Sequence, residues 1–214
     1  MSLNRQHHFL TPHGPTLNLD LKNYHGAELA PHLDALGALR IGVFREYPYL
    51  YDGSLEYERD YLGIYTRTPR SLVVLAWDAD RAVGATTCLP LVDEGPEFQK
   101  PFLDHGGYDL KDICYFGESI LLPQYRGLGV GKAFFARREA HARSLGLRIA
   151  AFCAVDRPVD HPQRPAGYRT LDTFWQSQGY TRQPGLQATF GWKETGEAAE
   201  SPKTLTFWTK NLDL

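Results

Sequence analysis

Several segments of the chain repeat apolar residues with the period of a strand or of a helix. Residues 16–22 alternate leucine with polar residues, which predicts a half-buried strand. Residues 28–45 place leucines three or four positions apart, which predicts a helix with one apolar face. Ser54 stands where it can cap a second helix over residues 55–65. The first part of the chain is therefore expected to form one strand followed by two helices.

A hairpin and a long excursion occupy the middle of the chain. Residues 72–77 and 81–89 are rich in apolar and β-branched residues and flank Asp-Ala-Asp, which predicts two strands joined by a turn. Residues 90–112 are rich in proline and glycine and predict an excursion from the sheet, with a short helix near 97–104. This excursion could form a lid or the contact of a homodimer.

The second half of the chain predicts a strand–helix–strand unit at the centre of the sheet. Residues 113–122 form an apolar segment that ends at Pro123, and residues 129–145 have a helical period that ends at Gly146. Residues 148–155 are almost unbroken apolar, as is typical of a strand buried on both faces. The remaining predicted elements are a proline-rich loop, a helix and two strands, over residues 156–167, 168–178, 186–192 and 204–209. This order predicts an α/β fold, with a mixed sheet covered by helices and one β-α-β crossover.

Length and composition fit a globular domain. The chain has 214 residues, and its 43% apolar and 22% charged residues exclude a disordered, collagen-like or coiled-coil protein. We expect one domain over residues 1–214, with residues 1–13 as a loose N-terminal end. The formal net charge of −2 lacks the basic excess that is typical of nucleic-acid binders, so no nucleic-acid partner is expected.

Cysteine and histidine usage indicates neither a disulfide framework nor a metal site. The 3 cysteines lie in apolar stretches, and so sparse and odd a set suggests a reducing compartment. The 8 histidines show no HxxxH or HExxH spacing. The N-terminus lacks the apolar run of a signal peptide, and no segment approaches the ~20 apolar residues of a membrane span. These observations predict a cytoplasmic protein without a membrane partner.

Three closely spaced glycines follow the apolar strand over 113–122 and lead directly into the next helix. Glycine lets the backbone approach a ligand, and the first amides of a helix have no internal partner and lie at the positive end of its dipole. The segment Ile120–Lys132 therefore predicts an anion cradle, most naturally for phosphate, with Arg126 and Lys132 at its rim. The P-loop pattern GxxxxGK[ST] and the dinucleotide pattern GxGxxG both fail here. The alternative is a turn whose glycines only let the helix pack tightly on the strand.

The run Arg126–Gly131, Arg-Gly-Leu-Gly-Val-Gly, resembles the acyl-CoA signature Q/R-x-x-G-x-G/A of the GNAT superfamily of N-acyltransferases. Pro123 precedes it at the usual distance, and the element order from about residue 24 onward is similar to that fold. The resemblance implies a mixed, mostly antiparallel sheet with central splayed parallel strands and helices on both faces. It also implies acetyl-CoA as the acyl donor. The implied contacts are Ile120, Leu121 and Leu122 for the pantetheine arm, and Arg126, Gly127, Leu128, Gly129, Val130, Gly131 and Lys132 for the pyrophosphate.

Acyl transfer to an amine needs a proton acceptor, donors for the oxyanion and help for the leaving thiolate. Backbone amides near Leu121 are natural oxyanion donors. Glu118 lies in an apolar strand where an unpaired charge is costly, and the resemblance implies that a carboxylate on this strand acts as the base. The alternative for Glu118 is a structural ion pair or a solvent-facing position. Trp175 stands where the family often has its proton-donating tyrosine, so Tyr168, a tyrosine from elsewhere or water would protonate the thiolate.

Six tyrosines and several acidic residues gather in residues 46–65. Helices before the sheet commonly shape the acceptor pocket in the family that this chain resembles, and an aromatic, acidic surface suits a cationic amine. The resemblance therefore implies an enzyme that moves an acetyl group from acetyl-CoA to a primary amine of a small molecule or amino terminus. Two alternatives stay open: a solvated acidic helix face at residues 46–65, and a non-catalytic acyl-CoA-binding sensor or scaffold.

Overall fold

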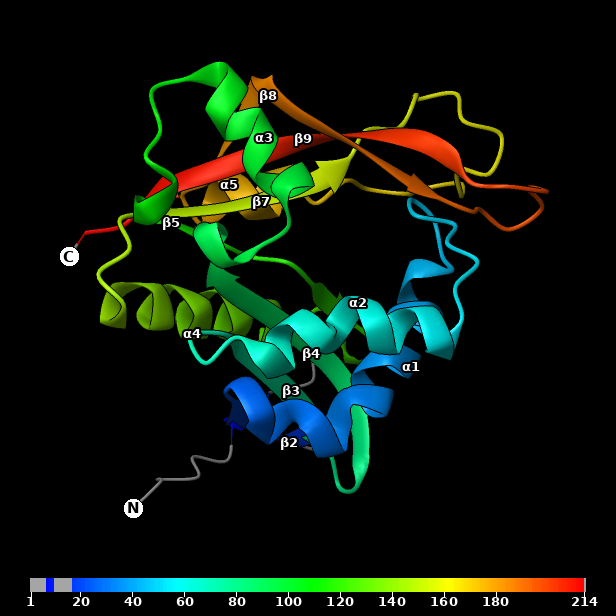
Figure 1. Cartoon of the computed structure of the whole chain (residues 1–214). Coiled ribbons are helices and arrows are strands. Elements are labelled where there is room, and N and C mark those ends of the chain that lie inside the picture. The colour runs from blue at the N-terminus through cyan, green and yellow to red at the C-terminus, as the bar shows by residue number, and fades with distance from the viewer. Residues whose placement is uncertain (1–6, 10–16, 214) are drawn as a thin grey trace.

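A computed structural model describes residues 7–9 and 17–213 of the chain. In this part of the chain, the strands form one sheet in the order β1-β2-β3-β4-β5-β7-β9-β8, and β6 pairs with β4 (Figure 1). The strands are β1 (His7–Phe9), β2 (Leu17–Tyr24), β3 (Leu72–Asp78), β4 (Arg81–Pro90), β5 (Ile113–Tyr115), β6 (Ser119–Leu121), β7 (Ile149–Val155), β8 (Thr181–Trp192) and β9 (Ser201–Asn211). The β5–β7 pair is parallel and the other pairs are antiparallel. The predicted mixed, mostly antiparallel sheet is therefore confirmed.

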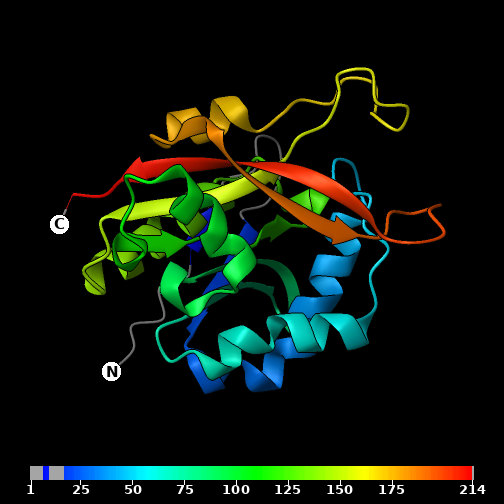
Figure 2. The same ribbon diagram turned by 45° about the horizontal axis from the view of Figure 1, so that its top comes forward.

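Helices cover both faces of this sheet. The α-helices are α1 (Leu33–Phe44), α2 (Leu55–Arg67), α3 (Pro96–His105), α4 (Val130–Ser144) and α5 (Asp172–Ser177). Side chains of β3 alternate between the two faces. Val73 and Leu75 pack with α1 and α2, whereas Leu72 and Val74 pack on the opposite face with α4. Toward the C-terminus, α3 and α5 lie on opposite sides of β7 and β9 (Figure 2).

The helices predicted before the sheet are present, and one begins later than expected. Ser54 caps α2, because its side chain accepts a hydrogen bond from the Tyr57 amide at 3.3 Å. The helix predicted over 28–45 is instead a 3-10 segment, Gly26–His32, followed by α1. Pro31 lies in that segment and has no amide hydrogen to donate, which disfavours an α-helix through this position. The short helix expected in the excursion is α3.

Two predicted elements of the second half differ from the structure. The strand predicted over 113–122 is interrupted, so that β5 and β6 are separate strands with residues 116–118 between them. The helix predicted over 168–178 is wrong at its start, since α5 begins only at Asp172. The Tyr168 amide donates a hydrogen bond to the Pro165 carbonyl at 3.1 Å in a turn. Tyr168 therefore belongs to the loop that precedes α5.

The ends of the chain also differ from expectation where they can be compared. Residues 7–9 form β1, which pairs antiparallel with β2, so this piece of the expected loose end is a strand. The rest of residues 1–13 lies outside the described residues. β8 and β9 extend beyond the strands predicted over 186–192 and 204–209.

Candidate active site

The sheet opens between its two central strands. β5 pairs with β7 as far as Tyr115 opposite Ala151, and the Phe116 amide still donates to the Ala151 carbonyl at 2.8 Å. Beyond this point β6 pairs with β4 and β7 pairs with β9, so that no ladder joins β6 to β7 in the part of the chain described here. The central parallel strands are therefore splayed, and each leaves an open edge in the gap.

The open edge of β6 presents two residues to this gap. The Leu122 amide donates to the Val83 carbonyl of β4 at 2.9 Å. Alternate residues of an antiparallel strand bond to the same neighbour, so Ile120 also faces β4, while Ser119 and Leu121 turn their backbone groups to the gap. Of the three residues expected to pair with a pantetheine arm, Leu121 is thus the one whose amide and carbonyl lie on the open edge.

The N-terminus of α4 lies where this edge ends. Gly127 and Gly129 have φ values of +79° and +93°, in the left-handed region that favours glycine, and Gly129 is the N-cap. The Ala133 amide donates to the Gly129 carbonyl at 3.2 Å and so begins the helical ladder. The amides of Val130–Lys132 precede it, and no described side chain caps them. This helix mouth, the segment Arg126–Lys132 at the N-terminus of α4, therefore has the geometry of an anion site.

Two cations flank the helix end. Arg126 Nε donates to the Leu121 carbonyl at 3.0 Å, and the Arg126 guanidinium pairs with Glu46 at 3.1 Å. The guanidinium thus lies across the open edge of β6. Lys132 is exposed, and none of the carboxylates in the described residues pairs with it. Leu128 is half-buried against the core under α4, so the residues expected to form the cradle come together at one place.

Glu118 is buried at the start of the open edge and is held on both carboxylate oxygens. It is 2% exposed, it pairs through Oε1 with Arg40 Nη1, and its Oε2 accepts from Thr87 Oγ1 at 2.5 Å. Arg40 Nε also donates to Glu58 Oε2 at 2.5 Å, and Glu58 accepts from the Tyr51 hydroxyl at 2.8 Å. One guanidinium therefore joins two buried carboxylates, and the group carries one net negative charge when all three are ionised.

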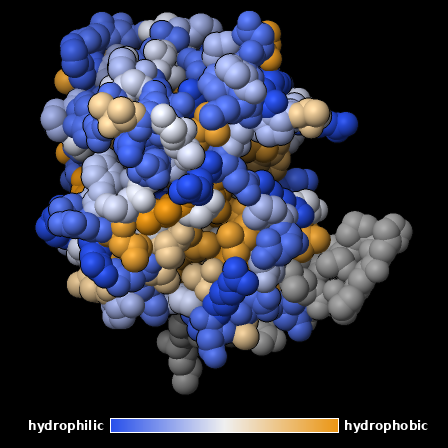
Figure 3. Space-filling view, turned by 90° about the vertical axis from the view of Figure 1, so that its right-hand side faces the viewer, coloured by the Kyte–Doolittle hydropathy of each residue, from blue (hydrophilic) through white to orange (hydrophobic). Residues whose placement is uncertain are grey.

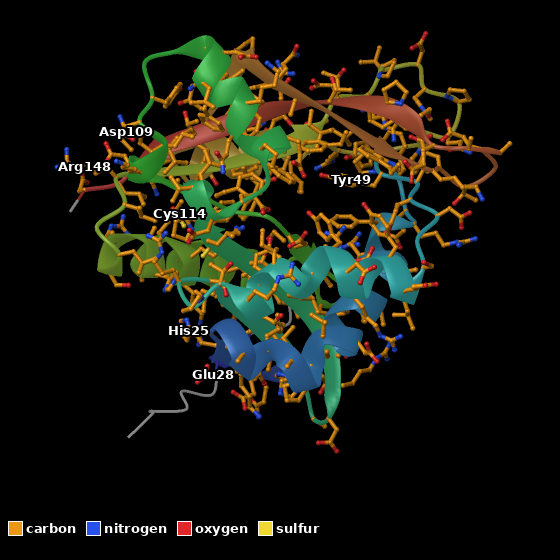
Figure 4. The ribbon with its side chains drawn as sticks, in the orientation of Figure 1. His25, Glu28, Tyr49, Asp109, Cys114 and Arg148 are labelled. Atoms are coloured by element: carbon orange, nitrogen blue, oxygen red, sulfur yellow. The ribbon has the colours of Figure 1, made fainter. Side chains whose placement is uncertain are left out.

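A cavity of about 320 Å³ opens beside the gap, and Glu118, Arg40 and Cys153 lie in its wall. Its other lining is mainly aromatic: Tyr49, Tyr51, Tyr57, Tyr61, Tyr115, Phe44, Phe98, Phe190 and Trp192. Apolar side chains gather across the middle of the face that Figure 3 shows. Tyr49 lies between the C-terminal strands and α2 (Figure 4). Of the tyrosines in residues 46–65, some therefore line this cavity and others lie in the core.

Tyr168 is not among the residues that line this cavity. Its ring packs edge-on against Tyr47, with centroids 4.6 Å apart, and Arg164 lies 5.1 Å from the ring centroid. Its expected role as proton donor stays a prediction. Trp175 packs on Phe152 with ring centroids 5.1 Å apart, among the residues that surround the core under α4 and α5.

Sequence reasoning missed the partners that hold Glu118. Arg40 lies four residues after Leu36 on the buried stripe of its helix, and Glu58 lies four residues before Leu62 on the buried stripe of α2. A charge on an apolar stripe requires a partner, and this signal could have marked both residues. The pairing of Arg40 with both Glu58 and Glu118 could not be read from the sequence, because the three residues are far apart along the chain.

Glu94 is a third buried carboxyl near this site, and its protonation should affect stability. It is 8% exposed, and burial, reinforced by Glu118, raises its pKa from 4.5 to about 8. Between these pH values the folded chain binds a proton that the unfolded chain has lost, so stability falls as pH rises. Glu94→Gln should therefore raise the unfolding temperature at pH 8 and change it little near pH 4. Thermal unfolding across this range, with Glu97→Gln on exposed α3 surface as the control, measures the effect. An equal shift at both pH values would contradict this assignment.

The described residues contain no cluster of three metal-ligating side chains. None of their helices is long and apolar enough to cross a membrane.

Comparison with known proteins identifies the family of this chain. The sequence model of the acetyltransferase (GNAT) family matches residues 39–166, which is more than half of the chain and includes Arg40, Glu118 and the helix mouth. No curated protein matches the sequence. The architecture is similar to several solved structures. A ribosomal-protein-alanine N-acetyltransferase from Brucella melitensis has a TM-score of 0.57 at 16% identity, over 89% of this chain and 99% of that one.

Two further structures support the same fold. An N-acetyltransferase from Staphylococcus aureus Mu50 has a TM-score of 0.59 at 12% identity, over 92% of this chain and 99% of that one. An acetyltransferase from Thermus thermophilus has a TM-score of 0.55 at 18% identity, over 96% of this chain and 100% of that one. With the splayed strands, the glycine-rich helix mouth and the family match together, this chain belongs to the GNAT acetyltransferase family.

Proposed function

We propose that the protein is an N-acetyltransferase that moves the acetyl group of acetyl-CoA to a primary amine by direct attack. The observation that carries the proposal is the succession, within residues 118–132, of the cavity beside Glu118, the open edge of β6 and the α4 helix mouth. A long donor with a thioester end and a phosphate-bearing end fits this succession. The acceptor is a small molecule or an amino terminus, and we expect the protein to act in the cytoplasm.

The helix mouth suits the diphosphate of the donor. Amides of Val130–Lys132 point out of the helix end, and Lys132 and Arg126 supply positive charge beside them. The Leu121 carbonyl, which accepts from Arg126 Nε, would accept instead from an amide of the pantetheine arm. Arg126 would then be free to turn toward the diphosphate.

The thioester end would lie at the cavity. The Leu121 amide on the open edge is the natural donor to the oxyanion that forms when the amine attacks the carbonyl carbon. Glu118, held in place by Arg40 and Thr87, would accept the proton that the amine sheds, directly or through water. The nitrogen–carbon bond forms, the carbon–sulfur bond breaks, and the sulfur leaves as a thiol after protonation.

The cavity wall favours a cationic acceptor. When Glu118, Glu58 and Arg40 are all ionised, the group has one net negative charge beside the cavity, and an alkylammonium group would balance it. Tyrosine rings in the wall attract such a cation through their π faces. A second cavity of about 490 Å³ shares Tyr51, Tyr57 and Trp192 with the first, and it offers room for the rest of the acceptor.

A non-catalytic acyl-CoA-binding module is the second candidate. The observation that favours it is Trp175, which stands where the proton-donating tyrosine of the family is expected and packs into the core. Such a protein would keep the helix mouth and bind the donor without turning it over.

Two measurements on the purified chain test the proposal together. Calorimetric titration should show that CoA binds at least ~10-fold more tightly than ATP or NAD. Free thiol should appear from acetyl-CoA in the presence of at least one member of a panel of primary amines. CoA binding without thiol release across the whole panel supports the non-catalytic module instead. Failure to bind CoA contradicts both candidates.

A further inference from the structure

We propose that Tyr49, on the loop between α1 and α2, is the general acid that protonates the leaving thiolate. This inference rests on the proposed acyl transfer. The proton donor would then lie on the loop between α1 and α2, whereas the resemblance implied a donor near the last helix.

Tyr49 lines the cavity beside the open edge of β7. The Asp156 amide donates to the Thr204 carbonyl of β9 at 2.9 Å, so by alternation Cys153 and Val155 turn their backbone groups to the gap. Tyr49 and Cys153 lie in the wall of the same cavity, which also contains Glu118. The Tyr49 side chain is therefore next to the edge opposite Leu121, across the gap through which the thioester would enter.

The loop that carries Tyr49 is held at several points. Arg157 donates through Nε to the Pro48 carbonyl at 2.6 Å and through Nη2 to the Tyr49 carbonyl at 3.2 Å. The Trp192 indole donates to the same Tyr49 carbonyl at 3.0 Å. The Tyr49 ring also packs on Phe44, with centroids 4.5 Å apart. These contacts fix the ring before any substrate arrives, as a proton donor requires.

The surroundings of Tyr49 suit the transfer of a proton. Burial raises the pKa of Tyr49 well above its ordinary value, so the phenol stays protonated throughout the neutral range. The Arg40 guanidinium and the Val155 backbone act in the other direction and stabilise the phenolate. In the step, the Tyr49 proton moves to the sulfur as the carbon–sulfur bond breaks. Glu118, which takes the proton shed by the amine nitrogen, passes it to water, and water returns a proton to the Tyr49 phenolate, so the protein ends unchanged.

The other tyrosines of the cavity differ from Tyr49 in their contacts or exposure. The Tyr115 hydroxyl lies 3.4 Å from Cys153 Sγ, and the Tyr51 hydroxyl donates to Glu58 at 2.8 Å. The Tyr57 side chain is 50% exposed at the outer end of the cavity. The Tyr61 ring lies under the Arg40 guanidinium, 4.4 Å from the ring centroid. Among the cavity tyrosines of the described residues, Tyr49 is the one whose loop Arg157 and Trp192 hold against the C-terminal strands.

Tyr49→Phe tests this assignment because it keeps the ring, and the carbonyl that Arg157 and Trp192 hold, and it removes only the hydroxyl. We expect kcat to fall by about 100-fold while CoA affinity and the KM for the amine stay within about 3-fold. Tyr115→Phe and Tyr168→Phe remove the two rival hydroxyls and should lower kcat less than Tyr49→Phe does. Tyr108→Phe, at a tyrosine that packs on Phe102 outside the cavity, is the matched control and should keep kcat within about 3-fold. Tyr49→3-fluorotyrosine carries a more acidic phenol and should move the alkaline limb of the kcat profile to lower pH, which a purely structural role would not do.

The outcomes separate this inference from the proposed function. Thiol release by the wild type with a fully active Tyr49→Phe variant overturns the Tyr49 assignment alone. A large loss in Tyr115→Phe or Tyr168→Phe with little loss in Tyr49→Phe does the same and moves the role to that residue. A wild type that binds CoA but releases no thiol with any amine overturns both the inference and the proposed transfer.

Discussion

Replacing Gly129 with valine should remove most of the affinity of the protein for CoA. Gly129 is the N-cap of α4 with a φ of +93°, and a β-branched residue in this region is strained by more than about 1 kcal/mol. Relief of that strain turns the following amides away from a bound diphosphate. Loss of two charge-assisted hydrogen bonds, at about 1.5–3 kcal/mol each, corresponds to a fall in affinity of about 100-fold or more. Calorimetric titration with CoA measures this change.

Gly146→Val is the matched control at the other end of the same helix. Gly146 also has a positive φ, +73°, and an added Cβ would meet nothing within 4 Å. Both valines should lower the unfolding temperature by a similar amount, and CoA affinity should fall in Gly129→Val alone. Equal CoA affinity in the two folded variants would show that the helix mouth does not bind the diphosphate.

Glu118→Gln should lower kcat by about 100-fold or more and leave CoA affinity within about 3-fold. The substitution keeps the size of the side chain and an oxygen for Arg40, but it removes the carboxylate that would take the amine proton. Loss of a positioned proton acceptor costs about 100- to 10,000-fold in rate. Steady-state thiol release at saturating acetyl-CoA measures the loss.

Glu58→Gln separates proton transfer from charge balance. Glu58 pairs with the same Arg40 guanidinium and is 0% exposed, but it is not among the residues that line the cavity. The two variants remove the same charge from the same ion-pair network, so a structural role predicts equal losses of kcat. We expect Glu58→Gln to lose less than about 10-fold. A loss as large as that of Glu118→Gln would assign both carboxylates to holding Arg40.

The helix mouth could be predicted from the sequence because its signals are local. Gly127, Gly129 and the helix that follows are consecutive, and their positive φ values and the uncapped amides follow from residue type and position. The family match over residues 39–166 confirms the resemblance that these residues carried. Signals of this kind need no knowledge of which distant segments meet.

The surroundings of Glu118 depend on contacts between distant segments. Arg40 lies 78 residues from Glu118 along the chain, and Thr87 lies 31 residues from it. Periodicity placed Arg40 on a helix but gave no means of choosing its partner. The loop that carries Tyr49 is held by Arg157, which lies 108 residues from Tyr49 along the chain. Such pairings are fixed by the packing of the whole sheet.

The interrupted central strand is a third case. Residues 113–122 are mostly apolar, so the hydrophobic pattern alone predicted one strand. The break follows from tertiary pairing, because β5 pairs with both β4 and β7, whereas β6 pairs with β4 alone among the described strands. Gly117 lies at the break, and a Cβ there would come within 2.2 Å of the Tyr65 hydroxyl oxygen. This glycine was a local clue to close packing at the point where the sheet opens.

A crystal structure of the protein with CoA tests the central claim most directly. The diphosphate should accept hydrogen bonds from the amides of Val130–Lys132, and the pantetheine arm should pair with Leu121 in the gap between β6 and β7. Its sulfur should lie at the cavity that contains Glu118 and Tyr49. CoA bound elsewhere on the protein, with β6 and β7 closed on each other or the helix mouth filled by a side chain, would contradict the account.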